Sequence, residues 1–250
     1  MKRWLGLILA AGLFPASIGA EELTAKEIVT RADDLLRGRS SSGSYRMTVT
    51  TPSWQRVYEL TAWVWEREKT FIRVTVPPKD KGFGTLRRGD NMWNYLPAVE
   101  RTIKIPPSMM LQPWLGSDFA NDDLALESSI VNDYDHRIVT VEPVEGSDAY
   151  KIELLPHPAA PVAWGKLIYW VRRDDFVPLR EEFINERGEL IKVLTFSEIR
   201  FMHDRTLPTR WTMTSQTQAG RSTVLELLDV TFNIPINDAV FTHEHLKRTE

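Results

Sequence analysis

The chain of 250 residues contains no cysteine, which excludes a disulfide framework and any thiol chemistry. It has no cluster of Lys and Arg of the kind that favours nucleic acid or an anionic membrane surface. It also lacks a Gly-x-Ser-x-Gly nucleophile elbow and a phosphate-binding glycine loop. Stability must therefore come from burial, and about 230 residues are enough to build one substantial core.

Long apolar runs are also missing beyond the first 20 residues, which have the pattern of a cleavable secretory signal. Lys2 and Arg3 precede an apolar stretch at residues 4–14, and small residues lead to a cleavage point after Ala20. The stretch is shorter than the ~20 residues that span a bilayer. We therefore expect a cleaved signal peptide at residues 1–20 and a single exported domain at residues 21–250.

Neither acidic nor basic residues dominate the chain that follows the predicted signal. Removing residues 1–20 takes away two basic residues and no acidic one, so the 31 basic residues become 29 against 34 acidic ones, a formal charge of −5. Nothing in this balance predicts a nucleic-acid partner.

The first element predicted after the signal is an amphipathic helix at residues 24–36. Thr24 and Glu27 have the spacing of a capping box, and Gly38 is a plausible stop. Apolar residues then recur at helical spacing and form one stripe: Ala25, Ile28, Val29, Ala32, Leu35 and Leu36.

From residue 44 onward the hydrophobic period changes to two, which predicts β-strands. Residues 55–66 are apolar on both faces, with Trp63 and Trp65 on one side and Leu60, Ala62 and Val64 on the other. A strand of a one-sided sheet would carry polar residues on its outer face, so this pattern predicts cover on both sides.

Roughly ten or eleven strands at 8–12-residue spacing indicate a mainly β protein with one antiparallel sandwich or barrel. A sheet of this size tends to curl. We expect a half-open antiparallel barrel whose concave apolar face is covered by a few helices, at residues 24–36 and around residues 109–126.

The stretch at residues 106–127 breaks the β pattern and is unusually apolar for a connection between strands. Methionine suits surfaces that adapt to varied partners. Two interpretations remain open: these side chains fill the core, or they cover an apolar cavity. The acidic residues Asp118, Asp122 and Asp123 do not have the spacing of a calcium loop, and Asp118 or Asn121 is better explained as a helix N-cap.

The sequence resembles the outer-membrane lipoprotein-sorting protein family, the relatives of the periplasmic lipoprotein carrier LolA. The resemblance covers about residues 24–246. It rests on PPKDKG, GDNMWNYLP, PPSMMLQPWLGSDFANDDL, DRTLPTRWTM and IPINDAVFTHEHL in this order, of which WLGSDFANDDL is the most specific.

The resemblance implies a half-open barrel that shields acyl chains of a lipoprotein or lipid in the periplasm, on the way toward the outer membrane. It also implies an inner-membrane lipid transporter as a partner, and we expect a monomer. The candidate lid and cavity residues are Trp63, Trp65, Trp93, Met109, Met110, Leu111, Trp114, Leu115 and Phe119.

No catalytic apparatus is apparent, and we predict no enzyme activity, no cofactor and no metal site. His243 and His245 lack the spacing of three or four that a helical pair of metal ligands prefers. Glu181 and Glu182 point to opposite faces of a strand and cannot share a proton. The main alternative is a non-enzymatic adaptor that docks on a lipid-exporting transporter or envelope complex; an enzyme acting on lipids or glycans has no supporting constellation.

Overall fold

The computed structural model describes residues 22–66, 68–121, 123, 129–158, 160 and 164–248. One helix, α1 (Ala25–Arg37), precedes the first strands. The strands of the first half are β1 (Ser40–Thr50), β2 (Gln55–Trp65), β3 (Lys69–Val76), β4 (Gly84–Arg88), β5 (Asn91–Leu96) and β6 (Arg101–Ile105). Those of the second half are β7 (Tyr134–Val144), β8 (Ser147–Pro156), β9 (Lys166–Arg172), β10 (Pro178–Ile184), β11 (Leu190–Met202), β12 (Arg205–Ser215) and β13 (Ser222–Phe232).

Short helical elements occupy the connections. These are the 3-10 turns η1 (Pro97–Val99), η2 (Pro107–Met109), η3 (Trp114–Gly116) and η4 (Asp238–Phe241), and the helices α3 (Ser129–Asn132) and α4 (His243–Leu246). Among the described residues, no helix is both long and apolar enough to cross a membrane.

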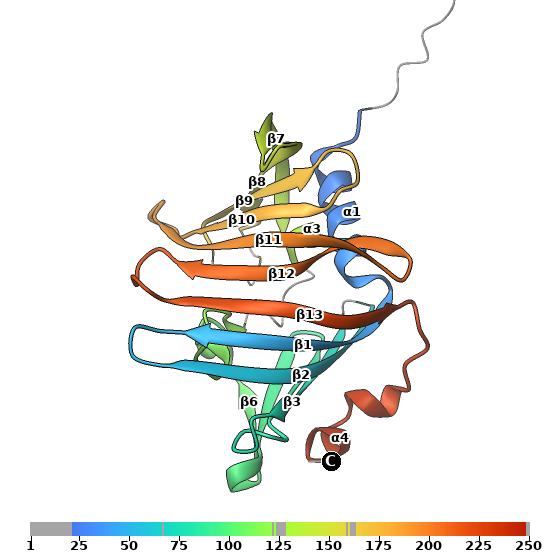
Figure 1. Ribbon diagram of the computed structural model, residues 1–250, viewed down its shortest axis with the longest axis vertical. Coiled ribbons are helices and arrows are strands. Elements are labelled where there is room, and N and C mark those ends of the chain that lie inside the picture. Colours follow the sequence, from blue (N-terminus) through green and yellow to red (C-terminus); the bar gives the residue numbers. More distant parts are fainter. Residues whose placement is uncertain are drawn as a thin grey trace, which may run out of the picture.

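All thirteen strands belong to one antiparallel sheet, in the order β6-β5-β4-β3-β2-β1-β13-β12-β11-β10-β9-β8-β7 (Figure 1). The first and last strands pair in the middle, so each half of the chain meanders outward to its own edge. The sheet is open, and the mainly β, half-open architecture expected from the sequence is confirmed. The sheet has thirteen strands, more than the roughly ten or eleven expected.

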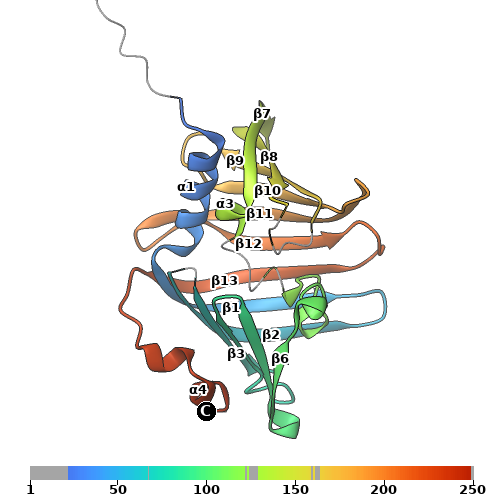
Figure 2. The ribbon, with the colours of Figure 1, turned by 180° about the vertical axis from the view of Figure 1, so that it is seen from behind.

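Helix α1 begins at the predicted capping box. Thr24 Oγ1 accepts a hydrogen bond from Glu27 N at 3.2 Å, and Glu27 Oε2 accepts one from Thr24 N at 2.8 Å. Gly38 ends the helix with φ 61°, in the left-handed region that favours glycine. The buried residues Ile28 and Val29 join the core cluster formed with β8 to β12, and α1 and α3 lie in front of the sheet in Figure 2. Each of these two side chains contributes roughly 1.5–3 kcal/mol by burial.

The two faces of the sheet differ in character. On the outer face a row of alternating charges crosses four strands, with Arg46 paired to Glu59 at 3.1 Å and Arg210 paired to Glu226 at 2.9 Å. Arg46 and Glu226 are directly opposite in the register of β1 and β13, which makes the row continuous. These paired, solvated side chains make the outer face polar, whereas the opposite, concave face is apolar.

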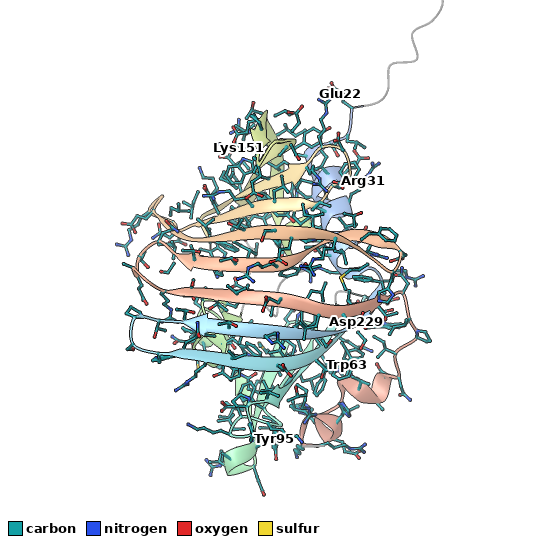
Figure 3. All side chains as sticks on the ribbon, in the orientation of Figure 1. Glu22, Arg31, Trp63, Tyr95, Lys151 and Asp229 are labelled. Carbon is teal, nitrogen blue, oxygen red and sulfur yellow. The ribbon has the colours of Figure 1, made fainter. Side chains whose placement is uncertain are left out.

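The outer face of β2 to β5 is covered by the C-terminal segment. Trp63, Trp65 and Trp93 pack there in a cluster with Phe241 and Leu246, and Figure 3 shows Trp63 beside this segment. The approach is close at Gly84 in β4, where a Cβ would lie 2.8 Å from Leu246 Cδ1 and would displace that side chain. Leu60, Ala62 and Val64 face the other way, so the predicted cover on both faces of residues 55–66 is confirmed.

The connection from β6 to β7 joins the two edges of the open sheet. A chain that leaves one edge and enters at the other has to cross one face of the sheet. The connection at residues 106–133 is called the insert here, and its described residues Trp114, Phe119 and Ile130 line the concave cavity, so this part of it lies on the concave side.

Candidate functional site

A cavity of about 170 Å³ lies on the concave face, between the core clusters of the two halves of the sheet. One wall comes from β1, β2 and β3 and the other from β9 to β13, with α1 and the insert completing the enclosure. Most lining side chains are apolar, including Met47, Leu60, Ile72, Leu167, Leu194, Phe196, Trp211, Met213 and Leu225. Such a lining favours an apolar occupant.

The part of the insert that enters the cavity is a small hairpin. Pro113 and Ala120 form an isolated antiparallel bridge, and Trp114 N donates a hydrogen bond to Phe119 O at 2.8 Å. Leu115 and Gly116 make the turn with φ of 50° and 75°. The side chains of Trp114 and Phe119 both line the cavity and are almost fully buried.

Contacts of both the indole N–H and the aromatic ring hold Trp114 in place. Its Nε1 donates to Thr85 Oγ1 at 2.9 Å, and both groups are buried. Its ring meets the edge of Phe83 with centroids 6.1 Å apart. The indole is therefore anchored to β4 in the lining of the cavity.

A first ionic link holds the insert to β13 and the turn that precedes it. Arg221 Nε donates to Asp118 Oδ1 at 2.7 Å, and Arg221 Nη2 donates to the carbonyl oxygens of Gly116 at 2.8 Å and Ser117 at 3.1 Å. Thr223 Oγ1 donates to Asp118 Oδ2 at 2.7 Å. The Asp118 carboxylate is buried and engaged on both oxygens, so it fixes this turn of the insert instead of capping a helix; the N-cap role considered for Asp118 is wrong.

A second ionic link joins the insert to β11. Lys192 Nζ pairs with Asp123 Oδ2, which also accepts a hydrogen bond from Ala120 N at 2.7 Å. The Lys192 ammonium lies 5.0 Å from the ring centroid of Trp164 and 4.6 Å from that of Phe183. Charged groups in such low-dielectric surroundings interact strongly. The two links together bind the insert to the half of the sheet that follows it in sequence.

The two ionic links give a structural role to the acidic residues of the insert that the structure describes. Asp118 and Asp123 take part in ion pairs, in line with the structural role expected for them, whereas Asp122 lies outside the described residues. Within the described part of the chain, no group of three His, Cys, Asp or Glu side chains could hold a metal ion.

Comparison with known proteins gives a family for the chain. A family model described as “-like: Uncharacterized protein” matches residues 66–248. A LolA superfamily protein from Nitrosomonas europaea is 23% identical, with 90% of this chain and 100% of that chain covered at a TM-score of 0.77. The chain belongs to the family of that model and has the LolA-like fold.

Two further solved structures share the LolA-like fold. A DUF1329 family protein from Desulfovibrio piger is 22% identical, with 89% of this chain and 97% of that chain covered at a TM-score of 0.81. A protein from Vibrio parahaemolyticus described as an outer membrane lipoprotein-sorting protein domain is 24% identical, with 90% and 98% covered at a TM-score of 0.76. No curated protein matches the sequence.

The nine candidate residues of this LolA-like chain fall into three places. Trp114 and Phe119 line the cavity, while Met110 and Leu115 pack against the core cluster of β1 to β3 beside it. Met109 and Leu111 are exposed, with Leu111 at the rim of a second hollow beneath the insert. The remaining three, Trp63, Trp65 and Trp93, lie on the outer face under the C-terminal segment, away from the cavity. The part of each residue in ligand binding stays a prediction.

Several polar residues of the site were missed by reasoning from the sequence. Asp33 and Glu181 line the cavity, and both had a readable signal. Asp33 follows Val29 by four residues on the apolar stripe of the helix, and Glu181 shares its strand face with Phe183. Arg221 had no such signal, because its partner Asp118 is 103 residues away in the sequence.

Proposed function

We propose that the LolA-like protein is a periplasmic carrier that binds acyl chains of a lipoprotein or lipid on its concave face, for transfer toward the outer membrane. The observation that carries the proposal is an apolar cavity closed by an insert that is tethered by two ion pairs, Arg221–Asp118 and Lys192–Asp123. An apolar core needs no such removable cover, whereas a cavity that loads and unloads a ligand does.

The energy of burial is sufficient for such a role without any polar recognition. Each CH₂ group moved from water contributes about 0.8 kcal/mol, so a C16 chain carries on the order of 10 kcal/mol. Part of this energy offsets the cost of opening the insert, and the rest provides affinity.

The present cavity corresponds to the closed state of the carrier. A cavity of about 150 Å³ in another protein holds one benzene, and this one is about 170 Å³. A long acyl chain therefore requires Trp114 and Phe119 to withdraw, which enlarges the hollow along the strands. The insert serves as the lid in this proposal.

The proposal includes several finer points. The mature protein starts after Ala20 and resides in the periplasm as a monomer of one domain, it has no enzyme activity, and an inner-membrane lipid transporter delivers its cargo. Amino-terminal sequencing of the exported protein tests the cleavage point, and a start elsewhere would revise the domain limits.

The test is native mass spectrometry of protein purified gently from the envelope, followed by delipidation and rebinding. We expect mass adducts of lipid or lipopeptide that disappear on delipidation and return on addition of the extract. Failure to bind any lipid or lipopeptide under these conditions would refute the carrier function.

A non-enzymatic adaptor is the second candidate, favoured by the fact that Trp114 and Phe119 are buried in the lining of the hollow. It predicts a filled cavity, in which the apolar insert packs against the protein's own core instead of a lipid, so the docking surface lies elsewhere. A membrane pull-down that Met110→Asp and Trp114→Ala leave unchanged, in a protein that binds no lipid, would support the adaptor.

A further inference from the structure

A second hollow of about 380 Å³ lies beneath the insert, at the ends of β10 to β13. The strands and their turns contribute polar side chains to its lining, namely Asn185, Lys192, Ser215, Thr217, Gln218 and Arg221. Thr217 and Gln218 are exposed, so this hollow opens to water. An enclosed apolar cavity beside an open polar hollow matches the two parts of an amphiphile, a tail and a hydrated head group.

The two spaces meet at Trp164 and Lys192. Trp164 contributes to the lining of both the cavity and the hollow. Lys192 lines the hollow, whereas Asp123, the carboxylate that pairs with it, lines the cavity. An amphiphile with its tail in the cavity and its head group in the hollow therefore places the junction of the two beside this ion pair.

Lys192 belongs to the concave face of the sheet. In the register of β10 and β11 it is opposite Phe183, and it precedes Leu194 by two residues; both of these neighbours line the cavity. Its side chain is only 8% exposed, and its ammonium lies near the rings of Trp164 and Phe183. A cation in such surroundings requires a partner of opposite charge.

The insert supplies this partner. Asp123 Oδ2 also accepts a hydrogen bond from Ala120 N at 2.7 Å, so the carboxylate is held to the hairpin of the insert. When the insert withdraws to admit an acyl chain, Asp123 moves away from Lys192. Breaking a buried ion pair by removal of one partner is strongly destabilising. A neutral ligand leaves this cost in place, whereas an anionic head group offsets it by replacing the carboxylate.

We infer that the cargo carries an anionic head group, a phosphate or a carboxylate, and that Lys192 binds this group in exchange for Asp123. Asp123 is then an internal substitute for the anion of the ligand, and the ligand itself promotes the opening of the insert. This inference rests on the proposed carrier function and specifies its ligand class.

The test compares four compounds with one C12 tail: dodecanoate, dodecyl phosphate, dodecanol and dodecylammonium. Each displaces the neutral fluorescent probe N-phenyl-1-naphthylamine from the full mature protein at pH 7.5, below its limits of solubility and micelle formation. We expect both anions to bind about tenfold or more tightly than the alcohol, the ratio that corresponds to one charge-assisted hydrogen bond. The ammonium compound should bind no better than the alcohol, and inorganic phosphate, which has no tail, should not displace the probe.

Two substitutions should shift the ratio of anion to alcohol affinity in opposite directions. Lys192→Gln removes the cation and should bring the ratio to about one. Asp123→Asn removes the internal competitor and should raise the ratio severalfold. Both break the same link to the insert, so an easier opening of the insert acts on all four compounds alike and cancels in the ratio. Lys151→Gln is the matched control, because Lys151 pairs with Glu142 at 3.4 Å outside both linings, and it should leave the ratio unchanged.

Three outcomes overturn the inference while leaving the carrier function intact. The first is binding of the alcohol or the ammonium compound as tightly as the anions, which decides the matter in the unmodified protein even if a variant does not fold. The second is an unchanged ratio in Lys192→Gln. The third is displacement of the probe by inorganic phosphate as effectively as by dodecyl phosphate, which would assign the hollow to a free anion. A protein that binds neither the probe nor any of the four compounds overturns the carrier function as well.

Discussion

Replacing Arg221 by alanine should open the lid, and this perturbation separates a lid from a piece of core. The guanidinium makes three hydrogen bonds to residues 116–118, at 2.7, 2.8 and 3.1 Å. Its removal leaves the Asp118 carboxylate, whose side chain is 5% exposed, without its cation. Loss of one partner of a buried pair costs about 3–5 kcal/mol.

The cost here should lie below that range, at about 2 kcal/mol. The Arg221 side chain is 21% exposed, and Thr223 Oγ1 still donates to Asp118 Oδ2. A shift of about 2 kcal/mol in the balance between closed and open insert raises the open fraction about 30-fold, at 1.4 kcal/mol per factor of ten. Since the apparent affinity scales with the fraction of competent protein, lipid should bind up to about 30-fold more tightly.

The assay combines two measurements on Arg221→Ala. Hydrogen exchange should become faster at residues 114–121 than in the strands, and the apparent Kd for a C12 or C16 amphiphile should fall. Arg210→Ala is the matched control, because Arg210 forms a half-exposed pair with Glu226 on the outer face, worth about 0–1 kcal/mol. Loss of stability throughout the sheet together with weaker lipid binding would refute the lid, since it would make the insert an integral part of the core.

Three further predictions concern Trp114, the apolar part of the insert and the C-terminal segment. Trp114→Phe should lower the free energy of unfolding by about 1 kcal/mol through loss of the hydrogen bond to Thr85, and Trp114→Ala by about 3–5 kcal/mol, both measured by urea denaturation; an unchanged stability in Trp114→Phe would contradict the anchoring role of the indole N–H. Met110→Asp should weaken binding of a C12 amphiphile, whereas Met109→Asp, at a position 43% exposed, should leave it nearly unchanged; the reverse order would exclude Met110 from the lid surface. Burial, assisted by the charges of Arg73 and Arg248, lowers the pKa of His245 below 6.5. As the pH falls, the unfolded chain therefore takes up the proton before the folded protein does. The free energy of unfolding should decrease as the pH is lowered from 7.5 through 6.5 to 5.5. Burial also lowers the pKa of His136, which adds to the same loss of stability at low pH. His245→Gln should therefore remove only part of this pH dependence. An unchanged dependence in that variant would exclude His245 as its source.

Local features of the fold could be predicted from the sequence. The capping box at Thr24 and the stop at Gly38 depend on neighbouring residues alone. The stretch at residues 55–66, predicted as a strand from its alternation, is β2 (Gln55–Trp65), one residue shorter. These elements are readable because alternation and turn chemistry act over a few residues.

The insert was harder to predict. A helix was expected around residues 109–126. Among the described residues of this range, Asn121 and Asp123 are helical, whereas residues 113–120 form the turn η3 and the hairpin from Pro113 to Ala120. Pro113 removes a backbone donor and restricts the residue before it, which disfavours a continuous helix. The remainder of the range lies largely outside the described residues.

The ionic links of the site depend on strand order and could not be predicted from local patterns. Arg221 meets Asp118, and Lys192 meets Asp123, because the insert crosses from the edge strand β6 to the edge strand β7 over the concave face. That crossing follows only from the pairing of β1 with β13, which joins the two ends of the chain.

The central claim, that the concave cavity holds an acyl chain beneath the insert, is tested most directly by a crystal structure of the mature protein purified from the envelope without detergent. The carrier function predicts continuous tubular electron density between α1 and the sheet, with Trp114 withdrawn from its contact with Thr85. A structure of such protein with Trp114 and Phe119 in place, combined with no lipid in an organic extract of the same crystals, would contradict it.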